Sequence, residues 1–424
     1  METEKLLKPI RETGIGFYAA AGALSVVALW MLAAWLYQLR NGLIVTGLRD
    51  WGVGYGAPWG VYIATFVWYI GIAHGGIAIS AAIRLLRLEA YKPIARIAEV
   101  VTVISLMMAG ANITFDIGRP DRIFNMIVNY WSRVGHSPLV WDVTVILIYM
   151  VLSISYLVIS MRDDIAALRR RLPRLFAPLY ALVLFGYHPE EREKREQMLW
   201  WLALALICLM TLLSGGVVPW LFGLMVSQAG WFSALQGPYF LIGALASAIA
   251  AIIVVVFLVR RVLGWEKEIS AEVFSGLSKP LAVLLIAYLY LVLQEQLTIL
   301  YAGPPAEQSI SHALLFGHFA PLFWMVIGVM AVSVAYLVLQ WLGALPLSVG
   351  GTAIAAAGVV AVLWVKRILI VVPTFLHPRL PYPTGVYVPT WVEWSLFAGT
   401  VALAVLLFMG FSKMFPLMEM EVRR

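Results

Sequence analysis

The sequence predicts an all-α polytopic membrane protein, and three observations lead to that fold class. Of the 424 residues, 62% are hydrophobic and 12% are charged, whereas soluble domains carry about 25% charged residues. Mean hydropathy is +0.89. Apolar runs of about 20 residues, which is the length of a membrane-spanning helix, recur along the whole chain. The net charge of +7 therefore gives no reason to expect a nucleic-acid partner.

Ten of these apolar runs are expected to be transmembrane helices. Each combines sufficient length with few charges, and polar or proline-containing segments separate them. The predicted spans are 15–37, 57–83, 94–115, 139–161, 198–222, 239–259, 279–301, 314–340, 348–372 and 391–415.

Lysines and arginines predict the orientation of these helices. Alternate loops, beginning with the N-terminal segment, hold 22 of the 30 lysines and arginines, and the opposite loops hold six. By the positive-inside rule, both termini are expected to be cytoplasmic, in the inner (plasma) membrane of a prokaryotic cell. The basic and acidic run 162–197 is expected to form interfacial helices on the cytoplasmic side.

An internal repeat relates the second to fifth spans to the sixth to ninth. P-L-V-W opens the fourth span and P-L-F-W the eighth, and K-P precedes both the third and the seventh. The offset of four spans predicts a parallel repeat of two four-helix bundles, with two peripheral helices. The predicted parts are an N-terminal segment with the first span (1–56), a first bundle (57–222), a second bundle (223–372), and an outer Pro-rich segment with the last span (373–424).

The stretch from residue 112 to 142 joins the third and fourth spans on the outer side and carries several charged residues where these spans meet the membrane edge. Asp116 and Asp142 each lie within a turn of a hydrophobic helix. Ionisable groups at such depth are costly unless they are paired or functional, so both are candidate site residues. For Asp121, Arg122 and Arg133, a solvated loop is the simpler interpretation.

Polar residues on three predicted helices suggest a proton relay. His74, counted back from Arg84 at about 1.5 Å per residue, lies near the midplane. Ser105 and Asn112 share one helix face with Asp116, and Tyr149 shares a face of the fourth span with Asp142. Hydroxyl groups that only join helices are the structural alternative.

The second bundle contains its own acid, Glu295, which we add to the candidate relay. His318, Lys366, Arg367 and Glu393 are candidates to neutralise it or each other. A buried ion-pair network that holds helices in register is the alternative interpretation.

The residues also limit which cofactors this chain could bind. His74 is the only histidine expected near the midplane, which argues against bis-histidine haem ligation, and the single cysteine, Cys208, rules out a cysteine-ligated iron–sulfur cluster in this chain. No metal site is expected. An outer pocket with acids, an arginine and aromatic rings, continuous with apolar helix faces, suits a lipid-soluble quinone. The candidate quinone-binding residues are Tyr62, Asp116, Arg119, Trp141 and Asp142.

Several motifs together resemble the NrfD/PsrC family of quinone-interacting membrane subunits. They are W-G-V-Y, A-H-G-G-I-A-I-S, D-I-G-R-P-D-R, S-P-L-V-W-D, V-P-T-F-L-H-P and V-P-T-W-V-E-W. The ten-span layout is similar to the longer branch, which includes membrane subunits of alternative complex III. The shorter polysulfide-reductase branch contacts quinone through an Asn and a His early in the first bundle, and residues 59–68 contain neither.

The resemblance implies a respiratory oxidoreductase subunit that exchanges electrons with an iron–sulfur subunit on the outer face and translocates protons. It implies a menaquinone- or ubiquinone-type quinone, no haem or iron–sulfur cluster in this chain, and a molybdopterin or other catalytic subunit in the same complex. Aromatic residues in or beside outer loops that contain no lysine or arginine, Trp231, Phe232 and Tyr301, are the expected docking surface. The alternatives are a secondary transporter or ion channel, which the prolines at span ends disfavour, and a structural anchor.

Overall fold

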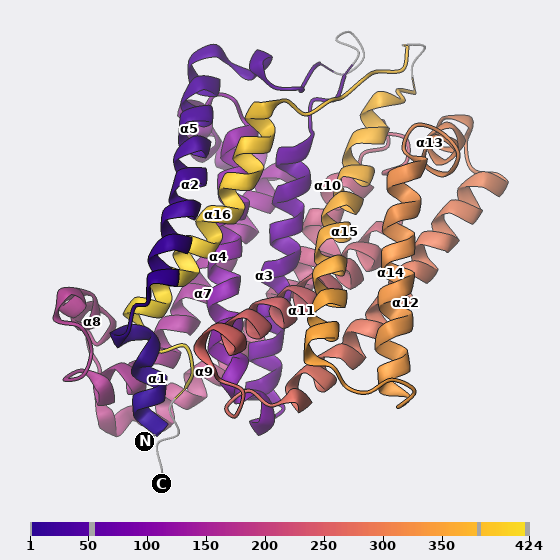
Figure 1. Ribbon diagram of the computed structural model, residues 1–424. Coiled ribbons are helices and arrows are strands. Elements are labelled where there is room, and N and C mark those ends of the chain that lie inside the picture. The colour runs from indigo at the N-terminus through magenta and orange to yellow at the C-terminus, as the bar shows by residue number, and fades with distance from the viewer. Residues whose placement is uncertain (1, 51–55, 380–382, 420–424) are drawn as a thin grey trace.

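The computed structural model describes residues 2–50, 56–379 and 383–419, and every regular element in these ranges is helical (Figure 1). Ten helical segments there are long and apolar enough to cross a membrane, which confirms the predicted multi-pass fold. They are α2 (Ile15–Asn41), α3 (Val61–Leu85), α4 (Lys92–Asp116), α7 (Pro138–Leu168), α9 (Arg192–Leu212) continued by α10 (Val218–Gly223), α11 (Gln236–Leu263), α12 (Ala271–Ala302), α14 (Ala320–Trp341), α15 (Val349–Leu376) and α16 (Trp391–Met414). The shorter helices are α1 (Glu2–Arg11), α5 (Ile123–Val128), α6 (Tyr130–Arg133), α8 (Ala177–Val183) and α13 (Pro305–Leu315).

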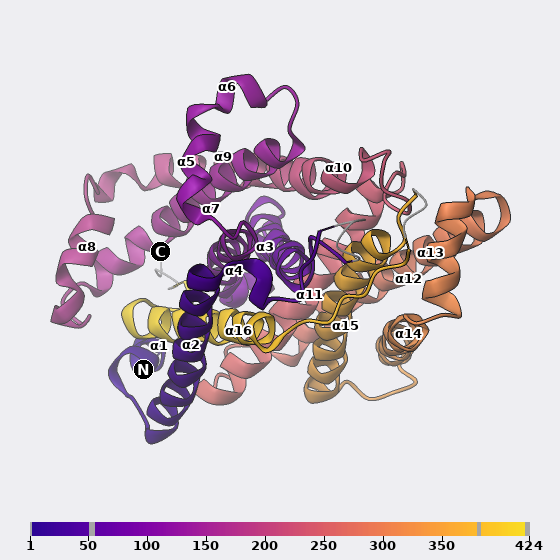
Figure 2. The same ribbon diagram turned by 90° about the horizontal axis from the view of Figure 1, so that it is seen from above.

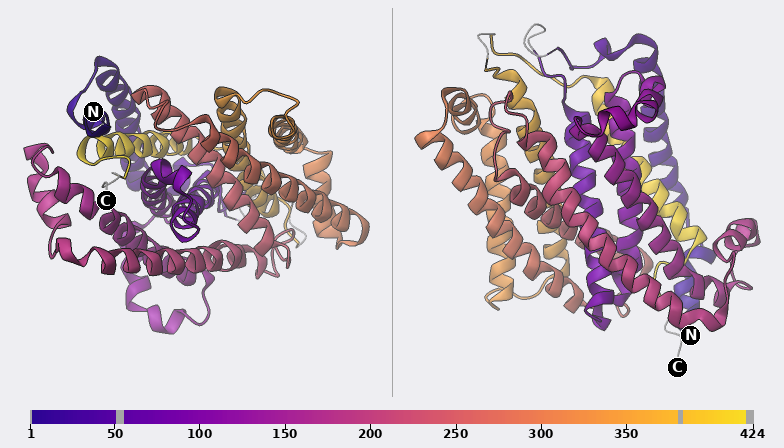
Figure 3. Two further views of the ribbon diagram at one scale, coloured as in Figure 1. Left: turned by 90° about the horizontal axis from the view of Figure 1, so that it is seen from below. Right: turned by 180° about the vertical axis from the view of Figure 1, so that it is seen from behind.

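The long helices form two groups that meet along α3. In the first group α3 contacts α4 and α9, and α7 contacts α4 and α9; in the second, α11, α12, α14 and α15 contact one another. Helix α3 also contacts α11 and α15, while α2 and α16 form a pair beside α4 (Figure 2). Figure 3 shows the oblique course of α9 behind the first group. The internal repeat itself stays a prediction, because helix packing does not test it.

The two ends of the bundle differ in what they contain. Both chain ends and helices α1 and α8 lie at one end, which we call the terminal face, and α5 and α13 lie at the other, the distal face. Under the predicted orientation, the terminal face would be cytoplasmic. Residues 162–197 lie at the terminal face, but α7 extends into this run as far as Leu168 and only α8 and short turns follow before α9.

The predicted span bounds shift by up to eight residues in the structure, and the larger shifts have physical causes. Helix α12 begins at Ala271 rather than 279, and α7 continues past 161, because backbone hydrogen bonding continues through charged residues where the helix leaves the hydrocarbon. The eighth span begins at Ala320 rather than 314, since α13 is a separate helix. The fifth span is interrupted by a π-helical turn, Leu213–Val217, just before Pro219, which cannot supply a backbone donor.

Helix α3 packs against its neighbours with almost no space between the backbones. A Cβ atom at Gly75 would overlap Ala248 of α11, and one at Gly76 would overlap Thr102 of α4. Glycine at these positions lets α3 approach helices of both groups closely. This close packing of the two following residues consequently fixes the position of His74 in α3.

Candidate functional site

Asp142 is the most isolated buried acid of the first helix group. It lies in the second turn of α7, its side chain is fully buried, and neither carboxylate oxygen has a hydrogen-bond partner among the described residues. Pro138 starts the helix, and the indole of Trp141 donates to the carbonyl of Val134, which fixes the preceding turn. A buried acceptor without a partner costs about 1–3 kcal/mol, so Asp142 is placed to receive a donor from a ligand.

Asp116 and Asn112 present further acceptors one turn apart on α4. The Asn112 side-chain amide donates to the carbonyl of Met108 at 2.8 Å. Its Oδ1 atom and Oδ1 of Asp116 have no partner in the described part of the chain. The predicted shared face of α4 therefore carries polar atoms whose hydrogen-bonding capacity is unused.

Tyr62 lies beside Asp116 and is bound to a residue that the sequence analysis did not single out. The Tyr62 hydroxyl donates to Gln38 Oε1 at 2.7 Å, and Gln38 Nε2 donates to the carbonyl of Phe115 at 2.8 Å. Helix α2 thereby connects α3 to the end of α4. The only signal for Gln38 in the sequence is a polar residue in the last turn of an otherwise apolar span.

Glu393 belongs to this distal region, and the hypothesis that it joins an ion-pair network with Glu295, Lys366 and Arg367 is wrong. Its carboxylate accepts from the backbone of Gly47 at 2.5 Å and of Thr390 at 3.0 Å, and from the Tyr387 hydroxyl. Burial and the Glu393 carboxylate raise the pKa of Tyr387, which keeps its hydroxyl a donor. These contacts fix the start of α16 against the loop after α2.

His74 and Tyr149 meet where α3, α4 and α7 come together. Their ring centroids are 5.4 Å apart. The Tyr149 hydroxyl and the Thr102 hydroxyl both donate to the carbonyl of Ala73, at 3.3 and 3.1 Å. His74 is fully buried, and Ser105 lies one turn beyond Thr102, also buried. The structure thus brings together His74 and Tyr149, two of the predicted relay residues.

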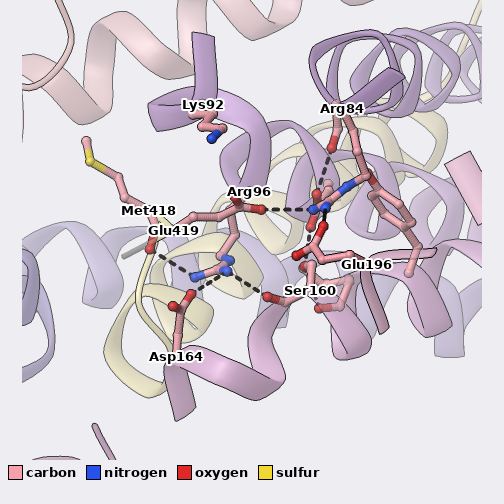
Figure 4. Close-up of polar contacts among 12 residues, drawn as sticks. Arg84, Lys92, Arg96, Ser160, Asp164, Glu196, Met418 and Glu419 are labelled. Atoms are coloured by element: carbon pink, nitrogen blue, oxygen red, sulfur yellow. Dashed lines mark hydrogen bonds and ion pairs between the residues drawn. The ribbon is translucent and has the colours of Figure 1, made fainter. Parts of the chain in front are cut away.

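A buried network near the terminal face was not anticipated. The hydroxyls of Ser80 and Ser160 donate to the two oxygens of Glu99, at 2.7 and 2.8 Å. Arg96 pairs with Asp164 at 2.6 Å and donates to backbone carbonyls of Ser160 and Met418. Figure 4 shows this cluster with Arg84, which bonds Glu196 and Glu419.

Arg96 is one of the 22 lysines and arginines counted in loops for the predicted orientation, although the predicted span 94–115 contains it, and it is not a loop residue. Arg96 is fully buried inside α4, because Asp164 and backbone carbonyls compensate its charge. The available signal was an arginine followed three residues later by a glutamate in an apolar run, which places both on one helix face.

The remaining candidate residues lie apart from the column of buried polar residues on α3, α4 and α7 that runs from Asp142 and Asp116 through His74 to Glu99. Arg119 lies on the distal surface and forms an exposed pair with Asp121, 2.9 and 3.1 Å between nitrogen and oxygen atoms. Hydrogen bonding to Arg119 lowers the pKa of Asp121. Glu295 lies on α12 in the second helix group, where it lines a cavity with Lys366.

One predicted docking residue is buried. Trp231 is fully buried, stacked near Trp59, with its indole donating to the carbonyl of Ile370 at 2.8 Å. The expectation that it forms an exposed aromatic surface is wrong, because that loop folds back onto α3 and α15. Phe232 and Tyr301 are exposed as expected.

The distal half of the first group thus offers acceptor atoms of Asn112, Asp116 and Asp142 within a largely apolar set of helices. Ionised carboxylates accept hydrogen bonds and protonated ones donate, so such a site can exchange protons with hydroxyl or carbonyl oxygens of a ligand. In the described ranges, no three His, Cys, Asp or Glu side chains come together as a metal site.

Comparison with known proteins gives a consistent picture. The family model described as polysulphide reductase, NrfD, matches residues 52–378. A Halobacterium salinarum protein assigned as a membrane subunit of a dimethyl sulfoxide reductase is 30% identical over 72% of this chain, and the match covers 65% of that longer relative. A selenate reductase subunit of Mesobacillus selenatarsenatis is 25% identical over 95% of this chain and 93% of its own length. An Hdr-like menaquinol oxidoreductase integral membrane subunit of Archaeoglobus fulgidus is 23% identical, with 97% and 96% covered.

Proposed function

The chain belongs to the polysulphide reductase NrfD family, whose members matched here are membrane subunits of oxidoreductase complexes, and from that premise we propose that it binds quinone or quinol in the distal half of the first helix group. Electrons pass between that quinone and an iron–sulfur subunit docked on the distal face. The same complex also contains a molybdopterin or other catalytic subunit. The name of the Archaeoglobus relative, a menaquinol oxidoreductase subunit, supports a quinone substrate.

The observation that carries this proposal is Asp142, a fully buried carboxylate with both oxygens unpartnered among the described residues. A quinol presents two hydroxyl donors and an apolar tail, which fits unpartnered acceptors embedded in apolar helices. Asp116, one turn beyond the unpartnered Oδ1 of Asn112, supplies a second acceptor from α4. The residues present therefore fit the proposed substrate.

The proposed chemistry for these residues is proton transfer. Oxidation of a quinol releases two electrons and two protons. The carboxylates of Asp142 and Asp116 accept the protons, and when quinone is reduced the protonated carboxyls donate them. Tyr62, fixed by Gln38, and Trp141, fixed by Val134, define the walls of the site. The exposed Arg119 would contribute at the mouth.

We further propose that protons move from this site toward the terminal face. His74 and Tyr149 lie between the distal acids and the terminal network, and Ser105 and Asn112 continue the polar face of α4. Glu99, held by two serine hydroxyls, is the next buried protonatable group. Proton movement along this column is the finer part of the proposal, and Glu295 lies outside it.

The test is quinol turnover by the complex purified with its co-purifying partners. Asp142→Asn preserves shape and removes the proton-accepting oxygen, so turnover should fall strongly while the composition of the complex is unchanged. Thr144→Val on the same helix, whose hydroxyl already donates to the carbonyl of Val140 at 2.7 Å, is the matched control. Wild-type turnover by Asp142→Asn, together with unchanged quinone content after extraction, would place the site elsewhere.

A further inference from the structure

A separate polar cavity lies in the second helix group, between α11, α12, α13 and α15. Its volume is about 30 Å³. Seven of its lining residues are polar or charged: Gln236, Glu295, Gln296, Glu307, Ser311, Lys366 and Thr374. Nothing in the proposed quinone chemistry uses these residues.

Two of these residues have opposite charge and lie inside membrane-spanning helices. Lys366 of α15 is 2% exposed, and Glu295 of α12 lines the same cavity. The Lys366 ammonium lies 5.5 Å from the ring centre of Tyr239 and 5.7 Å from that of Phe323. A charge at this depth costs at least about 2.5–3.5 kcal/mol unless compensated, so the cavity between lysine and glutamate requires an explanation.

The cavity has the volume and the polar partners that water requires. A buried water needs about 10–15 Å³ and two to four hydrogen-bonding groups, so this cavity can hold two. Gln236 is 4% exposed, and its Oε1 has no partner among the described residues. The Ser311 hydroxyl is directed to Gln296 Oε1. Water between Gln236, Glu295 and Lys366 would satisfy the unpartnered acceptor and connect the two charged groups.

One end of the cavity reaches the distal face. Glu307 of α13 lines it and pairs with Arg379 at 3.2 Å, with side chains 15% and 34% exposed. This partly exposed pair connects the lining of the cavity to the solvent-facing loop that follows α15. Protons could therefore pass between bulk water and Glu295 without crossing the first helix group.

A permanent positive charge lies on the other side of Lys366. Arg367 is 2% exposed, its guanidinium lies 4.6 Å from the ring centre of Phe240, and it lines a small cavity with Gly71 of α3. Gly71 is one turn from His74 along α3. Arginine stays protonated in proteins, whereas a buried lysine can lose its proton, so only Lys366 can respond by releasing charge.

We propose that Glu295 and Lys366 form a second proton-exchange site, filled by water from the distal face. The Glu295 carboxylate accepts a proton from hydronium that enters from the distal face, which leaves water and a carboxyl, and the Lys366 ammonium releases a proton to water, which leaves a neutral amine and hydronium. The charged or titratable groups around the pair are Tyr239, Tyr288, Glu307, Arg367 and Arg379. The neighbouring Arg367 charge favours release of the Lys366 proton by repulsion.

The experiment requires no quinone, so its failure is independent of the proposed quinone site. The complex is sealed in liposomes with the distal face outward, and infrared difference spectra are recorded as the external pH is changed at constant internal pH. We expect a carboxylate-to-carboxyl signal in the wild type that disappears in Glu295→Gln. In Lys366→Met the signal should move to higher pH, because the carboxylate loses its cationic partner.

Gln294→Ala, on the same helix with its side chain directed to Thr298 at 3.2 Å, is the matched control and should retain the signal. If Glu295→Gln does not assemble, the double variant Glu295→Gln/Lys366→Met removes both charges together and should also lack the signal. Persistence of the wild-type signal in Glu295→Gln, or in the double variant if only that one assembles, would overturn the proposal. So would a signal that follows internal pH alone, or no such signal in the wild type.

Discussion

The two ends of the first helix group treat buried charge in opposite ways. At the terminal face, Arg96 donates to Asp164 and to three backbone carbonyls, and both oxygens of Glu99 accept from serine hydroxyls. At the distal end, Asp142 has no partner for either oxygen among the described residues. The charged groups at both ends are almost completely buried, so burial alone does not distinguish the paired groups from the unpartnered acid.

Under the proposed function, the difference separates charge that maintains the fold from charge that binds a ligand. A hydrogen-bonded ion pair compensates its own desolvation, and removing one partner exposes that cost in the folded protein. An unpartnered carboxylate already carries its cost. Its replacement by a neutral amide should therefore leave stability nearly unchanged and affect only the function of the site.

The largest expected effect is on the terminal face. Asp164→Ala leaves the buried Arg96 charge without its acid and should destabilise the protein by about 3–5 kcal/mol. Thermal unfolding of the purified complex measures this as a lowered midpoint. Asp163→Ala is the control, since Asp163 pairs with Arg195 but is 30% exposed, and such partly exposed pairs contribute less. Equal midpoints for the two variants would remove the contrast between the ends.

The second effect concerns the distal end. Asp142→Asn should lower quinol turnover about 100-fold, the typical contribution of a positioned acid–base group, with an unfolding midpoint near that of the wild type. Asp116→Asn should act in the same direction. A large loss of stability with proportionate loss of turnover would show that these acids are structural, like Asp164.

A smaller effect is expected between the two ends. His74→Gln retains hydrogen bonding and most of the volume but removes the two ring nitrogens through which an imidazole can accept one proton and release another. Turnover should fall about tenfold with assembly intact, because proton transfer toward Glu99 slows. Acidification of the medium by the complex in liposomes gives a second readout. Full activity would mean that the distal acids exchange protons only with the distal side.

The smallest effect is expected at the exposed pair. Asp121→Asn breaks its hydrogen bonds to Arg119, but this pair is in water and its loss should change neither turnover nor the unfolding midpoint measurably. Since Arg119 lowers the pKa of Asp121, any contribution to stability is present at neutral pH. It is lost only as the pH falls below about 4, through the folded-state pKa. A clear change at neutral pH would make Asp121 part of the site.

Much of the fold could be predicted because hydropathy is a local property of the chain. All ten spans and the depth of Asp142 follow from runs of apolar residues and from nearby charges. Long-range partners do not follow from such runs: Glu393 accepts from Gly47, 346 positions away, and Arg96 pairs with Asp164 on another helix. The burial of Trp231 depends on a loop folding back onto two helices, for which the sequence around it gives no signal.

The glycines at 75 and 76 have a consequence for relative motion of the helices. Because the backbone of α3 at Gly75 lies directly against Ala248 of α11, sliding or rotating one helix group against the other at this point would produce steric overlap. The contact between the two helix groups at Gly75 is therefore expected to be rigid. We therefore expect coupling between the proposed proton sites of the two groups to be electrostatic, through Arg367, which lines a small cavity with Gly71 of α3, and to need no movement of whole helices.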